Sequence, residues 1–154
     1  MKVIIADLDG TLFDHSHRTK NLDIGFDEYN SLLHLDEPIH GVCEILRAMY
    51  KTHIIIIITG RPEQYREATV DKLFKHMVPY HHLYMRPTDD MRSDTMLKAD
   101  ILNRALEHID AEENAVDLIL EDRNCVVDMW RRMGFTCLQV NNFEIKKESL
   151  NVKR

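Results

Sequence analysis

Short hydrophobic runs alternate with longer amphipathic stretches along the chain. Residues 3–6, 54–58 and 118–120 form β-branched or aliphatic runs that are too short for helices, so they predict strands. Weaker strand candidates are "LYMR" from Leu83 and "TCLQV" from Thr136. Because polar residues do not alternate within the three strong runs, both faces of these strands are expected to be buried, as in a parallel sheet covered by helices.

The amphipathic stretches between these runs predict helices. They span residues 41–51, 62–76, 94–108 and 124–133. Three of them start with residues typical of a helix N-terminus: Pro62 in a first turn, and Asp94 and Asn124 as N-caps. This alternation predicts right-handed crossovers and a Rossmann-like α/β fold, a doubly wound parallel sheet with helices on both faces. Ligands bind such sheets at the carboxyl ends of the strands.

Length and composition are those of an ordinary globular protein. A chain of 154 residues is expected to form one domain, residues 1–154, and to bury about 70% of its unfolded surface without a disulfide. No apolar run approaches the roughly 20 residues that cross a bilayer, and the run after Lys2 is too short for a signal peptide. We therefore expect no membrane association and a cytoplasmic location. The charged tail, about residues 144–154, is expected to fray.

The net charge and the cysteines exclude other classes. A formal net charge of -6 argues against a protein that coats nucleic acid, because such binding needs an excess of Lys and Arg. Any contact with nucleic acid should therefore be local. Cys43, Cys125 and Cys137 are odd in number and lack CxxC or metal-type spacing, so they are expected to be reduced thiols in the core.

Polar residues follow the three strong strand candidates at the point where each ends. They are Asp7 and Asp9 after the first, Thr59, Gly60 and Arg61 after the second, and Glu121 and Asp122 after the third. Lys98 lies near the start of a predicted helix, where its side chain can point back to the same edge. Because the carboxyl ends of parallel strands meet at one edge, these groups are expected to converge.

Converging carboxylates indicate a metal ion. They raise one another's pKa unless a cation neutralises them, and hard oxygen ligands favour Mg²⁺. An Mg²⁺ ion held by few carboxylates keeps positions for water and for a substrate phosphate. The pattern therefore favours a phosphorylated substrate.

The spacing of the first two acids suggests unequal roles. Asp7 and Asp9 face opposite ways on a regular strand, so the turn at Gly10 must begin early for both to reach the site. Asp7 suits a nucleophile that forms an aspartyl-phosphate, and Asp9 suits the acid that protonates the leaving group and the base that later activates water. Thr59 and Lys98 are expected to stabilise the phosphoryl oxygens.

Four ordered motifs, "DLDGT", "TGR", Lys98 and "EDR", resemble those of the haloacid dehalogenase-like (HAD) phosphohydrolase superfamily. The resemblance implies that Asp7 is the nucleophile and that Asp9 is the general acid/base and a metal ligand through its backbone carbonyl. It implies further that Thr59 and Lys98 bind phosphate and that Asp122 binds the metal directly. Glu121 stands where the superfamily often has Asp or Gly, and whether it ligates directly or through water is left open.

Two longer stretches narrow the resemblance. "EDRNCVVDMWRRMGFTCLQV" and "MRPTDDMRSDTMLK" are similar to the 3′-phosphatase domain of bacteriophage-type polynucleotide kinase/phosphatases, and the likeness covers residues 7 to about 140. It implies that arginines around the site bind phosphate and the nucleic-acid backbone. The matching residues are Arg61, Arg86 and Arg123, with Arg18 and Arg92 as further candidates. For Arg18, Arg86 and Arg92 the alternative is an ordinary solvated surface charge.

The segments between the motifs predict a minimal cap or none. Residues 11–51 are expected to hold a polar flap and one helix, and residues 61–98 a helix, a strand and a loop. An open site suits a DNA or RNA end, so we expect a phosphatase that removes a 3′-phosphate from a polynucleotide. The P-loop GxxxxGK[ST] of a kinase is absent, so no kinase activity is expected.

Two alternatives stay open. One keeps the chemistry and takes a nucleotide or a small metabolite as the substrate, since capless relatives also act on proteins and small molecules. The other is a catalytically idle domain that binds nucleic acid or a partner protein, and the presence of both Asp7 and Asp9 argues against it. The sequence does not decide the oligomeric state or the preference between DNA and RNA.

Overall fold

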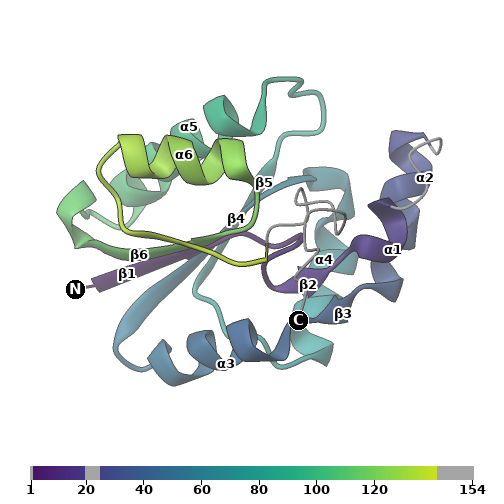
Figure 1. Ribbon diagram of the computed structural model, residues 1–154, viewed down its shortest axis with the longest axis horizontal. Helices are drawn as coiled ribbons and strands as arrows, with labels where there is room; N and C mark the ends of the chain where they lie inside the picture. The colour runs from purple at the N-terminus through teal and green to yellow at the C-terminus, as the bar shows by residue number, and fades with distance from the viewer. Residues whose placement is uncertain (1, 20–24, 142–154) are drawn as a thin grey trace, which may run out of the picture.

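A five-stranded parallel sheet forms the centre of the computed structural model, which describes residues 2–19 and 25–141 (Figure 1). Its strands are β1 (Lys2–Ala6), β4 (His53–Pro62), β5 (His82–Arg86), β6 (Val116–Glu121) and β7 (Cys137–Gln139). They lie in the order β5-β4-β1-β6-β7, and each neighbouring pair is parallel. The chain thus winds outward from β1 in both directions, which confirms the predicted doubly wound α/β sheet.

The central strand β1 is hydrophobic on both faces. Ile4 pairs with Ile55 of β4 and with Leu118 of β6. Side chains alternate between the two faces of a strand, so Val3 and Ile5 enter one hydrophobic core while Ile4 enters the other. None of these three β1 side chains is more than 2% exposed. A strand between two helical layers requires this uninterrupted hydrophobic run.

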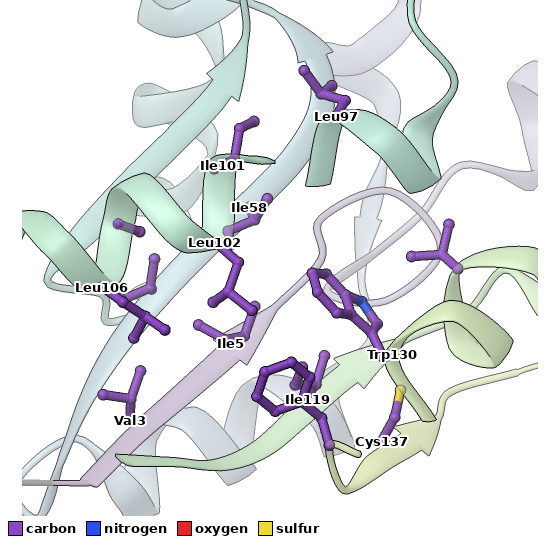
Figure 2. Packing of buried hydrophobic residues seen from close by; sticks show 14 of the residues in the cluster. Val3, Ile5, Ile58, Leu97, Ile101, Leu102, Leu106, Ile119, Trp130 and Cys137 are labelled. Atoms are coloured by element: carbon purple, nitrogen blue, oxygen red, sulfur yellow. The ribbon is translucent and has the colours of Figure 1, made fainter. Parts of the chain in front are cut away.

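Two longer helices cover each face of the sheet, as predicted. They are α5 (Asp94–His108) and α6 (Asn124–Arg132) on one face, and α3 (His40–Met49) and α4 (Arg66–Lys75) on the other. Figure 2 shows Ile101 of α5 and Trp130 of α6 in one cluster with Ile5 of β1. Leu46 of α3 and Leu73 of α4 belong to the second core.

The structure corrects the predicted helix starts. Ser93, not Asp94, caps α5, because its hydroxyl accepts a hydrogen bond from the backbone N–H of Met96. Arg123 occupies the N-cap position of α6, so Asn124 is already helical. Pro62 is extended and ends β4 before the 3-10 helix η2 (Glu63–Tyr65). The side chain of Asp94 is therefore available for a different partner.

Between β1 and α3 the chain forms a small insertion (residues 13–38). It contains β2 (Phe13–Asp14), α1 (Ser16–Thr19), α2 (Phe26–Ser31), the 3-10 helix η1 (Leu32–Leu35) and β3 (Glu37–Pro38). The expectation of a polar flap and one helix in residues 11–51 was wrong, because helices this short have too few turns to show a period in the sequence. In Figure 1, α1 and α2 lie beside the carboxyl ends of the strands, so the insertion acts as a minimal cap.

The three cysteines are free thiols, but only two are buried. Cys43 and Cys137 lie in the cores as expected, whereas Cys125 is exposed. The reason is the orientation of α6, whose neighbouring residues Val126 and Val127 face the sheet.

Two further expectations concern the ends and the surface of the molecule. The charged tail at about residues 144–154 lies outside the described residues. Among the helices of residues 2–19 and 25–141, none combines the length and the apolar character needed to cross a membrane.

One further described element, the 3-10 helix η3 (Glu113–Ala115), directly precedes β6.

Candidate active site

The carboxyl ends of β1, β4 and β6 meet at one edge of the sheet, as the sequence predicted. Asp7 directly follows β1, Thr59 lies in β4, and Glu121 ends β6. A cavity of about 380 Å³ opens at this edge. Its wall includes the predicted residues Asp7, Asp9, Thr59, Gly60, Arg61, Arg86, Arg92, Lys98 and Arg123.

A buried lysine links two carboxylates at the base of the cavity. The Nζ of Lys98 donates hydrogen bonds to Asp7 Oδ1 at 2.7 Å and to Glu121 Oε2 at 2.6 Å. Burial alone would lower the pKa of Lys98, but the carboxylates of Asp7 and Glu121 raise it above its usual range. Burial is the main cause that raises the pKa of Asp7 to about 7, although Lys98 opposes the shift.

Asp122 adds a third buried carboxylate to this group. One ligand oxygen each from Asp7, Glu121 and Asp122 lies within 4.8 Å of the others. Within the described residues, Asp122 Oδ1 is buried and has no hydrogen-bond partner. Burial, followed by the charges of Asp7 and Glu121, raises the pKa of Asp122 to about 9. Gly10 has φ of 87°, and a Cβ at this position would collide with the carboxylate of Asp122.

These three carboxylates fit a hard divalent cation. Their oxygens are close together, one of them lacks a donor, and a single ammonium group opposes three potential negative charges. Oxygen donors of this kind match Mg²⁺. The carboxylate of Asp9 is not part of the cluster, because it points to two arginines instead.

Two buried arginines hold the carboxylate of Asp9. Oδ1 of Asp9 accepts hydrogen bonds from Arg18 Nη2 at 2.7 Å and from Arg61 Nη2 at 2.5 Å, and Oδ2 accepts one from Arg61 Nε at 3.2 Å. Burial alone would raise the pKa of Asp9, but Arg61 and Arg18 hold it well below its usual range. Asp7 and Asp9 therefore share one cavity but have pKa values shifted in opposite directions, and the turn at Gly10 brings both there.

Asp36 pairs with the same two arginines. Its side chain is 0% exposed, and it accepts hydrogen bonds from Arg18 Nε at 2.8 Å, Arg18 Nη2 at 2.6 Å and Arg61 Nη2 at 3.3 Å. Arg18 and Arg61 are thus buried between two aspartates, and Arg61 also donates to the hydroxyl of Thr69. Contact of Arg18 and Arg61 with substrate phosphate stays a prediction. Both side chains position Asp9 and tie the insertion to the sheet.

A second pair of arginines converges on Asp94. Arg86 and Arg123 donate hydrogen bonds to different oxygens of its carboxylate. Arg86 also donates to the carbonyl oxygen of Gly60 at 3.0 Å, and its side chain is 11% exposed. Arg123 is more accessible, with 48% of its side chain exposed. Arg123 is therefore better placed than Arg86 to meet an incoming phosphate.

Part of the cavity wall was not predicted from the sequence. Its unpredicted members are His15, Tyr29, Asn30, Pro62, Asp90, Met91 and Asp94. His15, Tyr29 and Asn30 belong to the insertion, whose short elements escape detection from periodicity. Asp36 was also missed, because an isolated acid in a predicted flap resembles an ordinary surface residue.

The fold is shared with known hydrolases of the HAD superfamily. A HAD-superfamily hydrolase from Geobacter sulfurreducens superposes with a TM-score of 0.65 at 14% identity, over 90% of this chain and 86% of that one. This likeness shows the shared fold, and the family model that matches the chain is of the HAD type, so the chain is a HAD-type domain. More particularly, it belongs to the family of the polynucleotide kinase PNKP phosphatase domain, whose model matches residues 1–144.

Longer proteins contain a segment similar to this chain. A putative bifunctional polynucleotide kinase/RNA ligase of Autographa californica nuclear polyhedrosis virus is 28% identical over 135 residues, which are 84% of this chain and 18% of the viral protein. Chains in two structures of a Pnkp1/Rnl/Hen1 complex superpose with TM-scores of 0.74 and 0.75 at 35% and 34% identity. Each comparison covers 91% of this chain but only 45% and 42% of those chains. The chain thus spans less than half the length of these relatives.

Replacing Asp36 by Asn should destabilise the fold strongly. The substitution leaves Arg18 and Arg61 buried with one carboxylate between them, so we expect the free energy of unfolding to fall by about 3–5 kcal/mol. Urea denaturation followed by circular dichroism measures the change. Asp117→Asn is the matched control, because Asp117 pairs with Lys2 on the surface and its loss should cost at most about 1 kcal/mol. Equal small losses in both variants would contradict a dependence of the fold on the buried pairs.

Proposed function

We propose that this phosphatase domain is Mg²⁺-dependent, forms an aspartyl-phosphate on Asp7 and removes 3′-phosphates from polynucleotide ends. The observation that carries the proposal is the buried Asp7 carboxylate beside Lys98 in the cavity that Asp9 also lines. A nucleophile, a phosphate-binding cation and a second carboxylate are the groups that two-step phosphoryl transfer requires.

Asp7 supplies the nucleophile. Lys98 binds its Oδ1, which leaves Oδ2 to form a bond to phosphorus while the bond from phosphorus to the leaving oxygen breaks. The positive charge of Lys98 favours the ionised, reactive form of Asp7 and attracts the phosphoryl oxygens. Thr59 lines the same cavity and its hydroxyl proton can be donated to a phosphoryl oxygen, since its oxygen already accepts from the N–H of Arg61.

Asp9 transfers protons in both steps. Arg18 and Arg61 lower the pKa of Asp9 and so favour its ionised form, which is the form that takes a proton from the water that attacks the aspartyl-phosphate in the second step. In the first step Asp9 must give a proton to the leaving alcohol. The negative charge of a bound phosphate raises the pKa of a nearby carboxylate, so the substrate itself promotes protonation of Asp9.

Asp7, Glu121 and Asp122 would hold the metal ion. A bound Mg²⁺ ion would neutralise negative charge on the phosphoryl oxygens and on the three carboxylates. The residues of the chain position these charges: Lys98 fixes Asp7 and Glu121, and Gly10 leaves space for the carboxylate of Asp122.

The relatives support a polynucleotide end as the substrate. The viral relative is named for polynucleotide kinase and RNA ligase activities, and the solved relatives belong to an RNA repair complex. A net charge of -6 is unsuited to extended contact with a polyanion, whereas contact with a terminus needs only the local cations of the cavity. The proposal covers the phosphatase reaction alone, because the 154 residues contain no GxxxxGK[ST] sequence.

Substrate preference is the first test. Phosphate release should be fastest from a 3′-phosphorylated oligonucleotide, slower from mononucleotides and slowest from a 5′-phosphorylated oligonucleotide, with DNA and RNA versions of each. Asp7→Asn should reduce all three rates to background. Faster release from mononucleotides would favour the nucleotide phosphatase, and binding of oligonucleotides without release by the wild type would favour the idle binding domain.

The covalent intermediate has a separate test. If Asp7 carries the phosphoryl group, two substrates with different leaving alcohols yield the same intermediate. In the presence of glycerol, the ratio of glycerol phosphate to free phosphate should then be identical for both substrates. A ratio that depends on the leaving alcohol would indicate direct attack by water.

Metal binding should be visible without catalysis. Mg²⁺ at about 100 times its dissociation constant stabilises the folded state by about 2.7 kcal/mol, so the thermal midpoint should rise in a scanning experiment. Asp122→Asn should abolish this rise. Asp128→Asn, which changes an exposed carboxylate on α6, should retain it. An unchanged rise in Asp122→Asn would place the ion elsewhere.

A further inference from the structure

The loop between β5 and α5 (residues 87–93) places a methionine at the edge of the cavity. Met91 lines the cavity, yet 92% of its surface is exposed. Single exposed hydrophobic residues are common on protein surfaces, so exposure alone means little. Within residues 2–19 and 25–141, however, Met91 is the one large exposed hydrophobic residue that borders this cavity.

Hydrogen bonds fix the backbone on both sides of Met91. The Nη1 of Arg86 donates to the carbonyl oxygen of Asp90 at 2.9 Å and to that of Arg92 at 2.8 Å. The carboxylate of Asp90 accepts from the backbone N–H of Arg92 at 2.9 Å and from its guanidinium group. Arg86 is anchored in turn by the carbonyl oxygen of Gly60. The loop therefore holds Met91 in a defined place although its side chain has little packing of its own.

An aromatic ring lines the same cavity from the insertion. The hydroxyl of Tyr29 and Nδ1 of His15 are 2.9 Å apart and hydrogen-bonded. The guanidinium group of Arg18 lies over the ring at 4.4 Å from its centroid. Both contacts fix the ring in the wall. Met91 and Tyr29 thus bring two apolar surfaces, from separate segments, to a cavity whose base carries charged groups.

We propose that Met91, together with Tyr29, contacts the nucleoside that carries the 3′-phosphate. This inference rests on the proposed function, because a phosphate bound at Asp7 and Lys98 leaves its nucleoside to extend toward the cavity edge. The charged floor of the cavity binds the phosphate, and the apolar surface contacts the nucleobase and the sugar. A thioether adapts to aromatic rings of different shape, so the contact favours no particular base.

The test compares Met91→Ala with a matched control, Met77→Ala, which removes another exposed methionine from outside the cavity wall. The substrates are a 3′-phosphorylated oligonucleotide and glycerol 2-phosphate, which has no ring. Contacts between a thioether and an aromatic ring contribute about 0.3–1.5 kcal/mol, so Met91→Ala should lower kcat/KM for the oligonucleotide about 2- to 12-fold relative to glycerol 2-phosphate. Met91→Leu should restore most of the loss, and Met77→Ala should leave both substrates unchanged.

Equal losses on both substrates would mean that Met91 only supports the loop, and no loss on either would mean that the nucleoside lies elsewhere. Both results would overturn the inference. Failure of the proposed function looks different, because the wild type would then release no phosphate from the oligonucleotide. In that case the dissociation constant of a nucleoside 3′-phosphate is measured for Asp7→Asn and for the double variant that also carries Met91→Ala. Equal dissociation constants would overturn the inference.

Discussion

The burial of two arginines between two aspartates constrains the rest of this molecule. Isolated charges are costly to remove from water, and Arg18, Arg61 and Asp36 are each at most 3% exposed. They are tolerated because each arginine meets both Asp9 and Asp36, so positive and negative charges balance. Arg18 and Asp36 come from the insertion, while Asp9 and Arg61 come from strand ends. The insertion and the sheet are therefore held together by the pairs that also aim Asp9.

The neighbouring charge cluster has the opposite character. Asp7, Glu121 and Asp122 share a single buried cation, Lys98. Burial, together with the repulsion among the carboxylates, raises the pKa values of Asp7 and Asp122. Protonation relieves this repulsion in the free protein, and a divalent cation would relieve it without adding protons. In the cluster of Arg18, Arg61, Asp9 and Asp36, the charges are already paired in the folded protein, and these pairs support the structure. Under the proposed function, a metal ion and a substrate phosphate complete the other cluster.

Prediction from sequence succeeded where a local pattern carries the structural information. Hydrophobic runs located the five strands, and the rule that polar residues at parallel strand ends converge located Asp7, Thr59 and Asp122. It did not reveal contacts that depend on a tertiary partner. Arg18 and Arg61 carry the charge that phosphate binding requires, and both donate hydrogen bonds to Asp36. Nothing in the sequence around Asp36 indicates this pairing. Short helices of the insertion likewise owe their stability to these contacts rather than to their own periodicity.

The distribution of positive charge bears on how such a domain can approach a polyanion. Arg18, Arg61 and Arg86 are largely buried in ion pairs, so their charges do not form a basic surface. With a net charge of -6, long-range attraction to nucleic acid is weak, whereas Lys98 and Arg123 place positive charge in the wall of the cavity. A polynucleotide that lies along the surface gains little, whereas a terminus that places its phosphate in the cavity gains the full attraction. Under the proposed function, selectivity for the ends of a polynucleotide follows from the position of the buried cations rather than from recognition of the nucleotide sequence.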